Sequence, residues 1–297
     1  LSRAGDETLI IDNSETVFVG LKEPNLRTII TNIHTLDFSS LPMKDTIAFI
    51  LLQKTSQDNL MIANRIKKLF PDKFVLSRAT DEIEAAELLE NGVDRTVQIA
   101  RIVTHAILDE LETAKLKTSV FHLVSVIQEA AGKGVAIFLQ DNPDPDAIAS
   151  GCALKRIAEK YHIKSTIYYG GNIGRQQNKI LVDLLETDLI QLKTADEAME
   201  IAHAADKVAL IEASIPSKNN ILPLQITPHI VIDHHETDFS LVKGEFIEIL
   251  PKIGATSTIL TRYLRHLDIV PDPPLATALR YGIRVDTGGF TRNTTME

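Results

Sequence analysis

Short apolar runs alternate along the chain with longer stretches that have helical composition. Residues 134–139 form a continuous apolar run, which is typical of a strand buried on both faces of a parallel sheet. A helical stretch follows at residues 147–160, and further apolar runs, also predicted to be strands, occur at residues 207–211, 227–232 and 278–283. This alternation predicts an α/β fold with a parallel sheet.

The first third of the chain shows the same alternation. Residues 45–52 and 73–79 are predicted strands, and residues 58–69 and 81–90 are predicted helices. A βαβα order indicates a doubly wound parallel sheet. Two further helices are predicted at 97–116 and 120–131, with a polar hinge at 115–118. We therefore expect two doubly wound parallel-sheet domains, one over residues 1–116 and the other over residues 117–297.

Metal-competent side chains follow four of the apolar runs. In an extended segment alternate side chains leave the backbone on the same side, so Asp144 and Asp146 can reach neighbouring cations. Ligands bind at the carboxyl edge of open α/β sheets, and hard and borderline ligands from separate strand ends suit a two-metal hydrolytic site. Each residue alone is also an ordinary strand-ending residue. The set consists of Asp144, Asp146, Glu212, Asp233, His234, His235 and Asp286.

The region from Ser119 onward resembles the DHH phosphoesterase superfamily. That superfamily includes RecJ-like nucleases, oligoribonucleases, cyclic dinucleotide phosphodiesterases and manganese pyrophosphatases. The resemblance rests on four motifs in their usual order. They are Asn142-Pro143-Asp144-Pro145-Asp146, Asp233-His234-His235, Gly254-Ala255-Thr256-Ser257 and Asp286-Thr287-Gly288-Gly289-Phe290.

The resemblance implies a pair of Mn(II) ions, for which Mg(II) can substitute, and a metal-bridging water as the nucleophile. Asp144 would hold the first ion, Asp146, His234 and Asp286 the second, and Glu212 would bridge them. His235 would face the scissile phosphate, and Asp233 would orient the imidazoles.

The resemblance also implies residues that contact the substrate. The backbone N–H groups and hydroxyls around Gly254, Thr256 and Ser257 would receive a phosphate oxygen at a helix start. Arg175 and Asn178 lie in and after a glycine-rich loop, which is either a substrate-facing segment or an ordinary loop.

Two residues depart from the superfamily pattern. Gln140 stands where the superfamily has histidine, and Glu212 stands where it has aspartate. A neutral amide is a weaker Mn(II) ligand than imidazole, so the first metal site is expected to be weakened. Alternatively, Gln140 serves as a weak ligand, or a water takes its place.

The N-terminal region resembles the nucleotide-binding RCK domain, also called TrkA-N. The closest matches are Ala79-Thr80-Asp81 and residues 86–94. No G-x-G-x-x-G turn occurs before Gly132, so the first strand and its glycine turn are expected to be missing. Asp12 would then be the acidic residue that takes a ribose hydroxyl of a nucleotide; otherwise the domain only packs or dimerises, and a homodimer is expected by analogy with RCK domains.

Composition narrows the function further. The net charge of -9 argues against tight binding of long duplex nucleic acid and favours a short anionic substrate. No apolar stretch reaches the length of a membrane span, and the single cysteine fits a reducing cytoplasm, so a cytoplasmic protein without membrane contact is expected. Neither an initiator methionine nor a Gly-Gly-Gly-His domain is present, and we expect a fragment at both ends.

Three functions remain open at this point. The first is a Mn-dependent phosphodiesterase that hydrolyses short oligonucleotides or cyclic dinucleotides such as cyclic di-AMP. The second is a phosphoanhydride hydrolase of the pyrophosphatase type. The third is a non-catalytic nucleotide-sensing regulator with a degenerate metal site.

Overall fold

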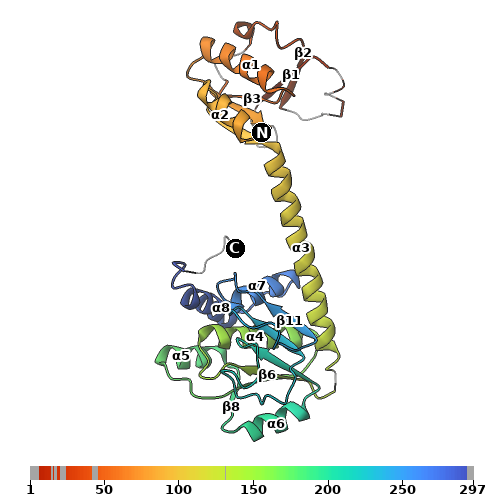
Figure 1. The fold of residues 1–297 in the computed structure, drawn as a ribbon, viewed down its shortest axis with the longest axis vertical. Coiled ribbons are helices and arrows are strands. Elements are labelled where there is room, and N and C mark those ends of the chain that lie inside the picture. The colour runs from red at the N-terminus through yellow and green to blue at the C-terminus, as the bar shows by residue number, and fades with distance from the viewer. Residues whose placement is uncertain are drawn as a thin grey trace. The chain divides into compact units, whose positions relative to one another are not determined.

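The computed structural model describes residues 7–14, 16, 19–20, 25–41, 46–130 and 132–292. The chain divides into two compact units, Leu1–Glu110 and Leu111–Glu297, and both combine parallel strands with helices (Figure 1). The division lies within helix α3 (Ile99–Gln128), slightly before the expected domain boundary after residue 116.

Helix α3 runs without a break through the two helices predicted from the sequence. The expected hinge at residues 115–118 is therefore wrong. Three of these residues are polar and Leu116 is apolar, but none of the four is a helix breaker. The Thr118 hydroxyl is satisfied within the helix by donating to the Ala114 carbonyl.

The N-terminal unit contains two parallel sheets. One has two strands, and the other has three strands in the order β3-β4-β5. Thr55 is the N-cap of helix α1, and its side chain accepts a hydrogen bond from Asp58 N. Asp81 caps α2 in the same way. The elements are β1 (Thr8–Asp12), β2 (Leu26–Ile30), η3 (Phe38–Ser40), β3 (Ala48–Leu51), α1 (Ser56–Leu69), β4 (Phe74–Ala79), α2 (Glu82–Glu90) and β5 (Arg95–Gln98).

The C-terminal unit is built on a six-stranded, all-parallel sheet in the order β11-β10-β9-β6-β7-β8. The central strands are buried along their whole length, as their continuous apolar runs predict. The strands are β6 (Val135–Leu139), β7 (Ser165–Tyr169), β8 (Leu189–Gln191), β9 (Lys207–Ile211), β10 (Ile230–Asp233) and β11 (Phe246–Ile249).

Alternate residues of these strands enter two separate hydrophobic cores. Val135, Ile137 and Leu139 of β6 pack with the C-terminal half of α3 and with α4, α7 and α8, whereas Ala136 and Phe138 pack with α6. Helices thus cover both faces of the sheet. The helices are α4 (Pro145–Lys160), α5 (Gln176–Leu185), α6 (Ala195–Ala204), α7 (Thr256–His266) and α8 (Pro273–Asp286).

The strand order reverses between β6 and β9. The chain proceeds from β6 to β7 and β8 on one side, and then returns to the other side of β6 with β9, β10 and β11. In open α/β sheets this switch point leaves a crevice at the carboxyl ends of the strands. No helix in the described part of the chain is long and apolar enough to cross a membrane.

Candidate metal centre

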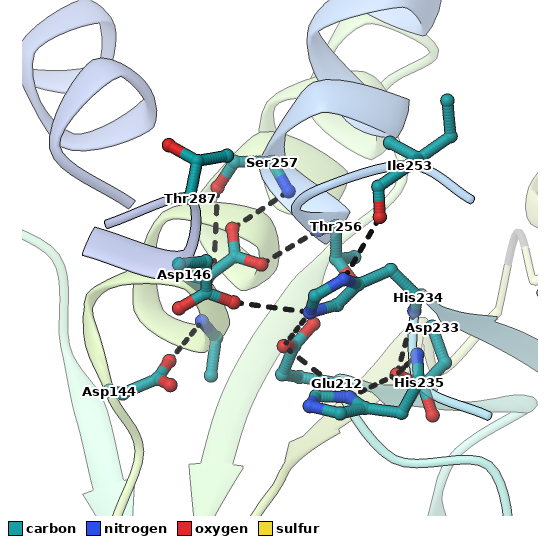
Figure 2. A network of polar contacts seen from close by, with 12 residues as sticks. Asp144, Asp146, Glu212, Asp233, His234, His235, Ile253, Thr256, Ser257 and Thr287 are labelled. Carbon is teal, nitrogen blue, oxygen red and sulfur yellow. Dashed lines mark hydrogen bonds and ion pairs between the residues drawn. The ribbon is translucent and has the colours of Figure 1, made fainter. Parts of the chain in front are cut away.

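Four side chains from separate elements converge at the switch point. Asp146, Glu212, His234 and Asp286 each offer one ligand atom, and these atoms lie within 4.8 Å of one another. Figure 2 labels the first three of these residues. Three of the four residues follow the adjacent strands β6, β9 and β10. The convergence is the one that the strand-end pattern predicts for Asp146, Glu212 and His234.

Asp146 lies in the first turn of α4 and is fully buried. Its Oδ2 accepts a hydrogen bond from Thr256 N (2.7 Å), and its Oδ1 accepts one from Ser257 N (2.8 Å). The carboxylate therefore sits against the N-terminus of α7, where the helix dipole favours negative charge. Burial and then the nearby Glu212 carboxylate nevertheless raise the pKa of Asp146 well above its usual value.

Glu212 directly follows β9 and combines burial with an unusual backbone conformation. Its φ of 60° is left-handed, although its N–H still donates to the Ile232 carbonyl of β10 (3.1 Å). The side chain is 0% exposed, and neither carboxylate oxygen receives a hydrogen bond from the described residues. Burial raises the pKa of Glu212, against the lowering effect of His234.

His234 faces two carboxylates with one ring nitrogen. Its Nδ1 lies 3.1 Å from the Ile253 carbonyl, which can only accept, so Nδ1 carries a proton. Its Nε2 lies 3.1 Å from Glu212 Oε1 and 3.1 Å from Asp286 Oδ2. Burial acts to lower the pKa of His234, but Asp286 and Glu212 outweigh it and raise the pKa to about 11.

Asp286 reaches the centre from a helix and not from a strand. The apolar run at residues 278–283 was expected to be a strand, but it belongs to α8, and Asp286 is the last residue of that helix. The sequence signal that would have corrected this is Asp272-Pro273-Pro274, where Asp272 caps the helix and proline occupies its first turn.

The Asp233 carboxylate orients one of the two adjacent histidines. Its Oδ1 accepts hydrogen bonds from His234 N (2.7 Å) and His235 N (3.1 Å) and lies 2.9 Å from His235 Nδ1. The imidazole of His234 is instead held by the Ile253 carbonyl, a partner that no sequence signal identified. The pairing with Asp233 raises the pKa of His235, whose side chain is 55% exposed.

Asp144 and Gln140 lie beside the centre but are not part of the four-residue group (Figure 2 shows Asp144). Asp144 is the N-cap of α4, and its Oδ1 accepts a hydrogen bond from Ala147 N (2.9 Å). Gln140 Oε1 accepts a hydrogen bond from Asn219 Nδ2 (3.0 Å), a second partner that the sequence did not indicate. Burial raises the pKa of Asp144.

The structure gives the expected phosphate-binding residues other partners. The N–H groups of Thr256 and Ser257 donate to Asp146, so these two donors are not free for a phosphate oxygen. Gly254 lines a groove between α7 and α8. The chain's own carboxylate takes these two donors, and substrate binding by Gly254 and by the hydroxyls of Thr256 and Ser257 stays a prediction.

The remaining candidates lie outside the centre. Asn178 is buried, and its amide donates to the Pro143 carbonyl (3.5 Å), so it supports the loop before Asp144. Arg175 is the exposed residue that precedes α5. Asp12 ends β1 in the N-terminal unit, and its Oδ1 accepts a hydrogen bond from Ser14 N (2.8 Å).

The chemistry of the four-residue group fits a divalent cation. With Nδ1 protonated, a neutral His234 turns the lone pair of Nε2 toward carboxylate oxygens, and these acceptors repel one another unless a proton or a cation lies between them. Asp286 and Glu212 raise the pKa of His234, so their carboxylates favour positive charge at this position. Three carboxylates and one imidazole form a donor set suited to Mn(II) or Mg(II).

Comparisons with known proteins identify the N-terminal region. Residues 1–99 match the TrkA-N domain model, which confirms the RCK-like resemblance of that region. The chain is also 35% identical over 260 residues to an uncharacterized protein, MJ1633, of Methanocaldococcus jannaschii. That match covers 82% of this chain and 52% of the relative, so the chain spans about half the length of the curated relative that it matches.

Two solved structures are similar to parts of the chain. An exopolyphosphatase-related protein from Bacteroides fragilis is 18% identical and covers 60% of this chain and 52% of its own, with a TM-score of 0.46. The NAD(P)-binding domain of an exopolyphosphatase-related protein from Archaeoglobus fulgidus is 21% identical and covers 38% of this chain and 84% of its own, with a TM-score of 0.33. TM-scores below 0.5 are too low to transfer an activity to this chain.

Proposed function

We propose that the C-terminal unit is a Mn(II)-dependent phosphodiesterase that hydrolyses short oligonucleotides or cyclic dinucleotides. The observation that carries this proposal is the buried group of Asp146, Glu212, His234 and Asp286, in which both Glu212 oxygens and His234 Nε2 receive no hydrogen bond from the described residues. Unpaired buried acceptors are costly, and a divalent cation satisfies all of them at once.

The cation would supply a Lewis acid that acidifies a bound water and screens the negative charge of a phosphate. The other functions fall to the chain's own side chains. His235 Nδ1 faces Asp233, so Nε2 is the ring nitrogen left for the substrate. The hydrogen bond with Asp233 raises the pKa of His235, which favours the protonated imidazole. His235 can therefore donate to a phosphoryl oxygen or to the leaving oxygen.

A groove beside the metal centre supports an anionic substrate with apolar parts. It has a volume of about 870 Å³ and is lined by residues of α7 and α8, and by Gly254 and Thr287, which follow Ile253 and Asp286 directly in the sequence. Arg262, Arg265 and Arg280 line it together with Leu279 and Ile283. Guanidinium groups suit phosphates, and an apolar wall suits nucleobases.

The test is hydrolysis by the full chain with Mn(II) and a panel of cyclic di-AMP, pApA, short RNA and pyrophosphate. The proposal predicts cleavage of at least one diester and loss of that cleavage in His234→Ala and Asp286→Asn. Hydrolysis of pyrophosphate alone would identify a phosphoanhydride hydrolase instead. Binding without any turnover, measured by calorimetry, would favour the nucleotide-sensing regulator.

A further inference from the structure

The unsatisfied acceptors among the four residues of the centre belong to Glu212 and His234. Glu212 Oε1 and Oε2 and His234 Nε2 are buried without a hydrogen bond from the described residues, and they belong to the group that also contains Asp146 and Asp286. Asp144 is not a member of any such group in the described part of the chain. The structure therefore groups ligand atoms around one cation position and does not group Asp144 with them.

Gln140 has two side-chain partners, Asn219 and Asp144. Its Oε1 accepts a hydrogen bond from Asn219 Nδ2 at 3.0 Å, and its side chain also hydrogen-bonds to Asp144. A carboxylate only accepts, so the Gln140 NH₂ group must be the donor to Asp144. Turning the amide by 180° would place its oxygen against the carboxylate, so the contact with Asp144 fixes the direction of the amide.

Asn219 is itself held in place. It adopts a left-handed conformation (φ 59°), and its carbonyl accepts a hydrogen bond from Asp141 N (2.8 Å), next to Gln140. The Gln140 oxygen, the atom that would have to bind a cation, is therefore turned toward a fixed donor. The Asp144 carboxylate is held by a second donor, because its Oδ1 accepts a hydrogen bond from Ala147 N.

We propose that the centre takes one divalent cation and not two. Asp146, Glu212, His234 and Asp286 hold that cation, and the Gln140–Asn219 pair supplies hydrogen-bond donors where a second cation would be needed. This inference rests on the metal centre of the proposed function, and it changes the chemistry available to that function, since one cation screens less of the substrate's charge than two.

The stoichiometry of Mn(II) tests the inference directly. The full chain is stripped of metal, titrated with Mn(II), and analysed for bound manganese by equilibrium dialysis and by electron paramagnetic resonance. One manganese per chain with the spectrum of an isolated ion is the expected result. Two manganese ions per chain with an exchange-coupled spectrum would overturn the inference and leave the proposed function intact. The absence of bound manganese would contradict both the inference and the proposed function.

A pair of variants two residues apart makes the test specific. Asp144→Asn keeps a good N-cap for α4 and is expected to leave the bound manganese at one per chain, with a dissociation constant within about threefold of the wild type. Loss of a residue that only hydrogen-bonds to a metal ligand typically weakens metal binding by roughly 10–100-fold. Asp146→Asn removes a ligand itself and is expected to weaken Mn(II) binding by more than that.

Asp286→Asn is the second ligand variant, because its side chain is 16% exposed and tolerates substitution better than fully buried Asp146. It is expected to weaken Mn(II) binding as Asp146→Asn does. Equal loss of Mn(II) in Asp144→Asn and Asp286→Asn, with both variants folded by circular dichroism, would contradict the single-cation centre.

Discussion

Two adjacent histidines have different partners and hence different roles. The His234 Nδ1 is fixed by a backbone carbonyl at Ile253, which turns Nε2 inward to the carboxylates, while His235 Nδ1 is fixed by the Asp233 carboxylate at the surface of the centre. A carboxylate partner makes the imidazole more basic than a carbonyl partner does. His234 is thus suited to hold a cation and His235 to exchange a proton with a substrate.

Asp233→Asn separates these two roles. The amide oxygen can still accept from the His234 and His235 N–H groups, but the negative charge beside His235 Nδ1 is lost. We expect unchanged Mn(II) affinity and a fall in turnover of about 10–100-fold, measured as kcat on the diester that the full chain hydrolyses. Loss of Mn(II) binding in this variant would show that Asp233 also supports His234.

Gly282 lies where α8 packs tightly against α4. A Cβ atom added there would lie 2.9 Å from Asp146 Cα and 2.9 Å from Ser257 Oγ. The absence of a side chain thus allows α8 to bring Asp286 within reach of the cation site.

Gly282→Ala is therefore expected to push α8 away from Asp146. Overpacking at a backbone contact costs about 1–3 kcal/mol, and here it also displaces a metal ligand. Chemical denaturation should show a lower free energy of unfolding, and Mn(II) titration should show weaker binding. Gly174→Ala is the matched control, since an added Cβ meets nothing within 4 Å there, and it should change neither measurement.

Strands β9 and β10 are joined at their amino ends by His229. Its Nδ1 accepts a hydrogen bond from Val208 N (3.0 Å), so this nitrogen must be unprotonated. Burial, and then the positive charge of Lys207, lower the pKa of His229 below its usual 6.5, although Glu245 and Glu129 act in the opposite direction. Protonation would break the bond to the strand.

The sign of the pH dependence follows from that shift. A base with a lowered pKa in the folded state binds fewer protons than in the unfolded state, so its contribution to stability is present above pH 6.5 and is lost as the pH falls below it. His229→Asn keeps an acceptor near the position of Nδ1 but does not titrate. Between pH 7.5 and 5.5 the melting temperature of this variant should fall less steeply than that of the wild type.

The sequence predicted the strands of the C-terminal sheet better than it predicted the last helix. Continuous apolar runs at β6, β9 and β10 indicate burial on both faces of the sheet. They located the strand ends that Asp146, Glu212 and His234 follow. An apolar hexapeptide alone does not distinguish a strand from a buried helical segment, so α8 was missed. The direction of the Gln140 amide depends on Asn219, far along the chain, and no local pattern encodes it.

At the scale of the whole chain, each unit has a hydrophobic core of its own. The core of the N-terminal unit extends from Phe38 to Val93, and the largest core of the C-terminal unit extends from Val120 to Leu279. All four residues of the candidate metal centre belong to the C-terminal unit. Separate cores favour separate unfolding transitions, because cooperativity follows contiguous buried packing.

Differential scanning calorimetry of the full chain should therefore show two unfolding transitions, and Mn(II) should raise the melting temperature of one of them. A ligand that binds only the folded state stabilises it by about 2.7 kcal/mol at a hundredfold excess over its dissociation constant, and this stabilisation reaches only the unit that contains the site. The Asp286→Asn variant should retain both transitions and lose the shift. A single transition that moves as a whole with Mn(II) would mean that the two cores unfold as one cooperative unit.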